Sequence, residues 1–195
     1  MPALHSRRAF LGYGAALAAL AARPASGAFA SAAPPALAIV DHTIPGADEF
    51  AAVAERRGVR VLAIAGDVGG AWMHQVEPLW RAGRGRVAGF TRTGALFCLE
   101  LLARDYGVAV ERRARHAPAP DGGFAHAAAG CDAAHAETML AAAGPRWVGE
   151  AARLALTPAS PPSVRLELVE PATPDDIEPA PVYSWVIGPR ARPAA

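Results

Sequence analysis

The sequence predicts an α/β fold, namely a three-layer domain with a mostly parallel sheet built from βαβ units. Short apolar runs typical of buried strands alternate along the chain with stretches that carry a helical apolar stripe. The connections between them are short, and Gly or Pro stands at several boundaries. Parallel neighbouring strands joined by crossover helices are the usual outcome of such a pattern.

The first half of the chain supplies the clearest elements. Residues 36–40 form an apolar run that ends at Asp41, which is typical of a buried strand. Phe50, Val53 and Ala54 are spaced as one helical face, and Gly58 is a natural stop for that helix. By the same reasoning we expect strands at 60–65 and 86–90, a short helix at 74–80, and a long apolar helix at 94–106.

The pattern changes after a fourth expected strand at 108–111. Pro and Gly residues at 118–123 indicate a loop, and an Ala-rich helix and a second helix are expected at 132–143 and 146–156. The chain ends in two apolar runs, 163–169 and 182–187, joined by a Pro-rich and acidic loop. We expect this C-terminal pair of strands to add a mixed edge to the sheet.

The N-terminus carries a recognisable motif. Residues 6–12 read Ser-Arg-Arg-Ala-Phe-Leu-Gly, and a mildly apolar stretch and the small-residue sequence Ala28-Phe29-Ala30 follow. This resembles a twin-arginine (Tat) export signal, with Gly12 where that pattern has Lys. The resemblance implies that residues 1–30 are removed after export by the Tat translocase. It also implies that residues 31–195 work in the periplasm, where we expect them to form a single α/β domain.

Charge and composition exclude several kinds of partner. The formal net charge is +1, and loss of Arg7, Arg8 and Arg23 with the signal changes it to −2. A domain of that charge has no electrostatic reason to bind nucleic acid or anionic lipid. No stretch reaches 18 unbroken apolar residues, so we expect no stable membrane insertion. The chain has no lysine, which excludes Schiff-base chemistry.

Polar residues follow the first three predicted strands. Ligands of open α/β sheets bind beyond the carboxyl ends of parallel strands, so we expect a site at this edge. Its acid–base groups would be Asp41, His42 and Asp67. The residues expected to bind a small anionic ligand are Trp72, His74, Thr91, Arg92, Thr93 and Gly94. The alternative interpretation is that Asp67 stabilises a turn and that Thr91 or Thr93 caps a helix.

The sequence favours no cofactor. Gly66, Gly69 and Gly70 lack the spacing of a dinucleotide or P-loop motif. His126, Cys131, His135 and Met139 resemble the ligand loop of blue-copper proteins, which offers an alternative soft-metal site. Three of them also fall on one stripe of the predicted helix, which is typical of a packing face. Cys98 and Cys131 could form a disulfide in an exported protein. The alternative is that Cys98 is a buried free thiol, because it lies in a stretch predicted to be an apolar helix.

These observations support an exported protein that binds a small ligand or assists an exported redox system. The alternative is a small cofactor-free enzyme, a hydrolase or isomerase, that uses the Asp and His residues at the sheet edge. A soft-metal-binding protein is the third interpretation. The sequence itself contains no motif that identifies a reaction.

Overall fold

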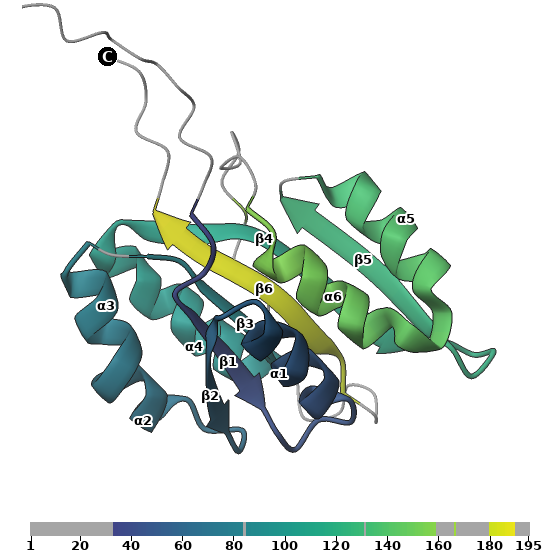
Figure 1. Ribbon diagram of the computed structural model, residues 1–195, viewed down its shortest axis with the longest axis horizontal. Coiled ribbons are helices and arrows are strands. Elements are labelled where there is room, and N and C mark those ends of the chain that lie inside the picture. The colour runs from purple at the N-terminus through teal and green to yellow at the C-terminus, as the bar shows by residue number, and fades with distance from the viewer. Residues whose placement is uncertain (1–32, 84, 131, 159–165, 167–179, 190–195) are drawn as a thin grey trace, which may run out of the picture. The chain divides into compact units, whose positions relative to one another are not determined.

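The computed structural model describes residues 33–83, 85–130, 132–158, 166 and 180–189. The predicted signal, residues 1–30, lies outside them. The described residues contain one open, mixed sheet of six strands in the order β2-β1-β3-β6-β4-β5 (Figure 1). These strands are β1 (Leu37–Asp41), β2 (Arg60–Ile64), β3 (Val87–Arg92), β4 (Val108–Pro118), β5 (Phe124–Gly130) and β6 (Val182–Pro189).

The first three strands follow the prediction. β1 is buried along its whole length and pairs in parallel with both β2 and β3. Between β1 and β2 runs α1 (Ala47–Arg56), which buries the predicted stripe of Phe50, Val53 and Ala54. Gly46 precedes α1 with φ +86°, a left-handed conformation that favours glycine at this turn. The parallel ladder therefore rests on strands and helices whose sequence pattern is strong.

The predicted mostly parallel sheet is wrong, because the other three pairings are antiparallel: β3 with β6, β6 with β4 and β4 with β5. The predicted position of the last strand is wrong too. β6 lies in the middle of the sheet, between β3 and β4, rather than at an edge (Figure 1). Seven of its eight residues are buried, which only an interior strand covered on both faces allows. The predicted strand at 163–169 lies outside the described residues except for Leu166, which is in no strand.

A hairpin replaces much of the predicted loop region. β4 extends to Pro118, and β5, which was not predicted, returns antiparallel to it. The predicted loop survives as the turn between them, where the Asp121 carboxylate accepts the backbone N–H of Gly123 at 2.9 Å. β5 reads Phe-Ala-His-Ala-Ala-Ala-Gly, with no β-branched residue, so its sequence gives no strand signal.

The remaining helices agree with the prediction to within a few residues. They are α4 (Thr93–Ala103), α5 (Ala133–Ala143) and α6 (Trp147–Leu156). The short helix expected at 74–80 is longer and irregular: α2 (Gly69–Ala71), a π-helical turn η1 (Trp72–Val76) and α3 (Glu77–Arg81). In the described part of the chain, no helix is long and apolar enough to span a bilayer.

The strand residues divide between two apolar clusters. Ala38 and Val40 of β1 join a cluster with α1, α5 and α6, whereas Leu37 and Ile39 join one with α3 and α4. Because successive strand residues point to opposite faces, the two clusters lie on the two faces of the sheet. In β4 a bulge between Val110 and Arg112 shifts the register, so residues after it change face.

Candidate functional site

The strand order creates a switch point between β1 and β3. From β1 the chain passes through α1 to β2 on one side, and from β2 it returns through α3 to β3 on the other side. In open α/β sheets, ligands bind in the crevice where the strand order reverses, beyond the carboxyl ends of the strands. Here those ends are Asp41 on β1 and Arg92 on β3. Their parallel pairing brings the two ends to the same edge of the sheet.

Asp41 is fully buried at this edge. Its Oδ1 accepts hydrogen bonds from the backbone N–H of Thr43 at 3.1 Å and from the Thr43 hydroxyl at 2.7 Å. Its Oδ2 has no hydrogen-bond partner among the described residues. A buried polar atom without a partner is costly, and a native protein normally compensates it with a water, an ion or a ligand. Asp41 therefore presents an unused acceptor at the switch point.

Thr91, the neighbour of Asp41 on β3, has a structural partner. Its hydroxyl accepts the Nε1–H of Trp185 at 3.0 Å, and both residues are buried. Because Val40 is in register with Phe90, Asp41 and Thr91 point to the same face of the sheet. The hydroxyl of Thr91 thus anchors the indole of Trp185 below the edge.

Arg92, Thr93 and Gly94 form the junction of β3 and α4. Arg92 is partly exposed, and α4 begins at the next residue without a side-chain cap. The first-turn N–H groups of a helix attract an anion when nothing caps them. A Cβ added at Gly94 would meet no atom within 4 Å, so the space beside this turn is open. Strand alternation puts Arg92 on the face opposite to Asp41, so the two side chains lie on opposite faces of the sheet at the same edge.

Other predicted site residues have local roles. The Asp67 carboxylate accepts the N–H of Gly69 at 2.8 Å, as the turn interpretation expects. Trp72 packs edge-on against Trp80 and Tyr106 in the apolar cluster beside α3. His42 and His74 are exposed. No hydrogen bond joins Asp41, His42 and Asp67 to one another among the described residues.

The soft-metal set does not gather around one point. His126 lies on β5 and bonds to another histidine, while His135 is exposed on α5. Met139 lines a groove between α5, α6 and α1, and the side chain of Cys131 is outside the described residues. Within the described ranges, no group of three or more His, Cys, Asp or Glu is arranged to hold a metal ion. Cys98 is exposed on α4 and is a free thiol, contrary to the expected burial.

A second polar cluster was missed by sequence reasoning. The Nδ1 atoms of His116 on β4 and His126 on β5 are 2.8 Å apart, and Nε2 of His116 is 2.9 Å from the hydroxyl oxygen of Ser184 on β6. His116 is fully buried and its ring lies 4.4 Å from that of Trp147. Burial, and then the neighbouring His126, lower the pKa of His116 to about 3. His116 is therefore neutral throughout the physiological range.

This histidine pair shares a row of the sheet with Arg92. Arg92 and His116 are both opposite Val182, and His116 is opposite His126. Residues directly opposite each other in antiparallel strands project to the same face. Arg92 and His116 are thus two strand spacings apart, about 10 Å, on one face and at one edge. The alternation of residues along β4 could have indicated the face on which His116 lies. The strand was predicted to end at residue 111, before His116.

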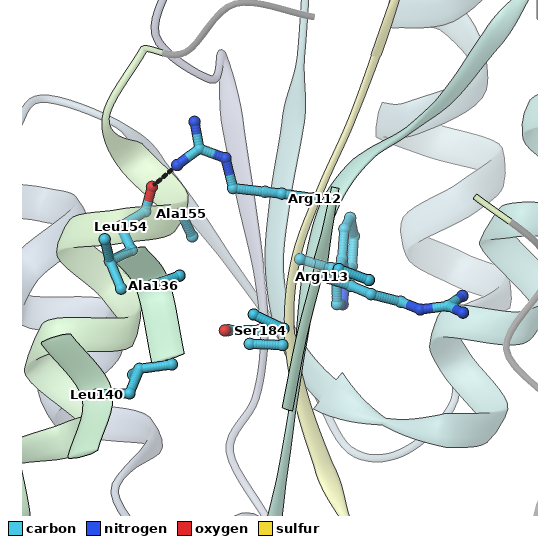
Figure 2. A pocket seen from close by; sticks show the side chains of 11 residues that line it. Arg112, Arg113, Ala136, Leu140, Leu154, Ala155 and Ser184 are labelled. Atoms are coloured by element: carbon cyan, nitrogen blue, oxygen red, sulfur yellow. Dashed lines mark hydrogen bonds between the residues drawn. The ribbon is translucent and has the colours of Figure 1, made fainter. Parts of the chain in front are cut away.

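Two hollows lie away from the switch point. A cavity of about 20 Å³ between the sheet and the helices α5 and α6 is lined mainly by Ala and Leu, and the Ser184 hydroxyl points toward it (Figure 2). That volume holds about one water, so no organic substrate reaches Ser184 there. A surface groove of about 490 Å³ is larger. Its charged lining residues are Glu49, Arg56, Arg146, Glu150 and Arg153.

The comparisons identify no relative. Protein-family models, curated proteins and solved structures give no match to this chain.

Proposed function

We propose that the protein is an exported, periplasmic small-ligand-binding protein whose site is the crevice between β1 and β3. The observation that carries this proposal is the fully buried Asp41 carboxylate, whose Oδ2 lacks a partner in the described part of the chain. It lies at the carboxyl end of β1, beside the switch point of the sheet, where ligands of open α/β folds bind. The Tat-like motif of residues 6–12 supports export.

The chemistry of the edge favours a ligand with two kinds of group. Arg92 and the uncapped first turn of α4 attract an anionic group. The free acceptor of Asp41 attracts an N–H or O–H donor. A small hydroxy acid or amino acid carries both groups on a short skeleton. We therefore propose a ligand of this class. The protein would act either as a binding protein for that ligand or as an accessory protein that binds it for an exported redox system.

The layer arrangement is part of the proposal. We propose three layers built on the units β1–α1–β2 and β2–α3–β3, with α1, α5 and α6 on one face of the sheet and α3 and α4 on the other. The two apolar clusters, which share no residue, support it.

The test is thermal stabilisation by defined probes. Lactate, glycine and inorganic phosphate are added to the purified protein, and the rise of the melting temperature is measured for each. Arg92→Ala is expected to weaken binding of lactate by roughly 1.5–3 kcal/mol, the scale of a lost charge-assisted hydrogen bond. Asp41→Asn is expected to weaken binding of lactate and glycine, because it removes the carboxylate that would accept their O–H or N–H donor.

Two arginine variants serve as matched controls. Arg115 is partly exposed like Arg92 and lies one residue before His116, on the other face, so Arg115→Ala should leave the probe response unchanged. Arg56→Ala changes the surface groove instead. If Arg56→Ala abolishes the response and Arg92→Ala preserves it, the ligand site is the groove and the proposed crevice is wrong. A wild-type protein that none of the probes stabilises removes the support for this ligand class.

A further inference from the structure

The contact between His116 and His126 has the geometry of a hydrogen bond rather than of a metal clamp. The ring centroids are 5.0 Å apart and the two Nδ1 atoms 2.8 Å apart. The difference is about two imidazole ring radii, so both nitrogens lie close to the line between the centroids and point at each other. Two ligands of one metal ion would instead point to a common third position. One proton must therefore lie between the two nitrogens.

That single proton allows two arrangements of the neutral hydrogen-bond chain formed by Ser184, His116 and His126. In the first, Nδ1–H of His126 donates to His116, and Nε2–H of His116 donates to Ser184. In the second, the Ser184 hydroxyl donates to Nε2 of His116, and Nδ1–H of His116 donates to His126. A neutral imidazole carries one N–H, so Nε2 of His126 is a proton acceptor in the first arrangement and a donor in the second.

We propose that His126 is an acid–base residue, positioned by His116 and Ser184, and that proton uptake at its Nε2 shifts the three residues fully into the first arrangement, in which the Ser184 hydroxyl is turned away from His116. The balance of protons is simple. A weak acid gives its proton to Nε2 of His126 and leaves as the anion, and His126 becomes an imidazolium with both nitrogens protonated. Its Nδ1–H must then donate to His116, which fixes the first arrangement along the whole chain.

Burial determines which residue of the chain takes the proton. His116 is fully buried and stays neutral because burial lowers its pKa to about 3. His126 is partly exposed, and partial burial lowers its pKa from the ordinary value. Ser184 is buried beside the small cavity (Figure 2). The surface residue therefore takes up the proton, and the buried residues transmit its effect to the interior.

The titratable and charged groups nearest to His126 come from β4, α5 and the turn before α6. From α5, the Glu137 carboxylate accepts the backbone N–H of Ala128 at 2.7 Å, two residues beyond His126. From α6, the ring of Trp147 lies 5.3 Å from that of His126 and carries no charge. The other titratable or charged residues on β4, α5 and the turn before α6 are Glu111, Arg112, Arg113, Arg115, His135 and Arg146.

The fit to the proposed edge site is a second reason to assign this role. His126 lies in the same row of the sheet as Arg92, on the same face. The two residues are three strand spacings apart, about 14 Å, so a weak acid can lose its proton at His126 before its anion moves along the edge to Arg92. The chain of hydrogen bonds exists without any ligand, so its test does not depend on the ligand proposal.

The experiment follows the imidazole nitrogens of the full-length protein by NMR as the pH is lowered, without ligand. Nitrogen shifts distinguish protonated from unprotonated ring positions. As His126 becomes charged, His116 is expected to convert fully to its Nε2–H form while remaining neutral. A His116 signal that does not change while His126 titrates overturns the proposal. This measurement needs no substitution.

A double-mutant cycle measures the coupling between Ser184 and His126 that passes through His116. Ser184→Ala removes the acceptor of the His116 Nε2–H, so the midpoint of His126 titration should fall by about half to one pH unit. In the His116→Phe background, Ser184→Ala should have no effect on His126, because the connection is gone. Thr138→Ala, which removes an exposed hydroxyl on α5, is the matched control. An equal shift in both backgrounds, or none in either, contradicts the relay.

Discussion

The indole of Trp185 on β6 lies against the backbone of Gly89 on β3, and its Nε1–H is bonded to Thr91 two residues further along. A Cβ at Gly89 would overlap the indole ring, so this position of β3 has no room for a side chain. The glycine and the indole together bring the two central strands into register just below the proposed ligand crevice. The central strand β6 is thereby coupled to β3, which carries Arg92.

Gly89→Ala is expected to destabilise the fold by about 3 kcal/mol, because the added methyl must displace a large, fully buried ring. Urea unfolding gives the measurement. Gly94→Ala is the control, since its Cβ meets open space and alanine is the better helix former. It should be neutral or slightly stabilising. Equal stability of the two variants would show that Trp185 can move at no cost.

The burial of His116 predicts how stability depends on pH. Its folded pKa is about 3, below the ordinary value of 6.5, so the unfolded chain binds the proton more readily. The resulting stability is fully present above pH 6.5 and is lost as the pH falls toward 3. Between pH 7.5 and 4.5 the loss should be about 3 kcal/mol. His116→Phe should remove most of this slope, whereas replacing the exposed His135 by Phe should not. An unchanged slope in His116→Phe would contradict this account.

A buried ion pair supports the bulge of β4. Nε of Arg86 donates to the Glu111 carboxylate at 2.8 Å, and Glu111 is the extra residue at the register shift between Val110 and Arg112. Arg86→Leu should cost about 3–5 kcal/mol, because it leaves a carboxylate buried without this partner. Burial already raises the pKa of Glu111, so the folded state of the variant binds a proton more readily than the unfolded state, and the loss should be smaller at pH 5 than at pH 8.

The double variant Arg86→Leu, Glu111→Leu is the control for that measurement. It removes both charges, so it should recover part of the stability lost in Arg86→Leu. Unfolding free energies of the three proteins give the comparison. A double variant that is less stable than Arg86→Leu would contradict this account. It would mean that the Glu111 carboxylate stabilises the fold even when Arg86 is absent.

Export is expected to depend on the arginine pair. Replacing Arg7 and Arg8 together by Lys should leave the protein in the cytoplasm at full length, because the Tat-like pattern is defined by the two arginines. Cell fractionation and the mass of the recovered chain give the answer. Arg23→Lys lies outside the motif and should be exported normally. A double variant recovered from the periplasm in processed form would exclude this route.

The parallel half of the sheet could be predicted because its signals are local. β1 and α1 bury the residues that the apolar runs and the 3.6-residue stripe indicate, and α4, α5 and α6 begin and end close to the expected residues. The edge that holds Asp41 and Arg92 follows from the same pattern, since strands joined by crossover helices run in parallel. For these elements, short-range periodicity and chain connectivity are sufficient.

The tertiary structure decided the rest. No local signal distinguishes an edge strand from a central one, so the place of β6 between β3 and β4 depends on which strands its two apolar faces can cover. The face on which His116 lies depends on the bulge at Glu111, because a shift of one residue reverses every side chain that follows. The contacts that join His116, His126 and Ser184 come from three strands that are adjacent only in the folded sheet. Strand periodicity is encoded locally, whereas register and strand order are set by long-range packing.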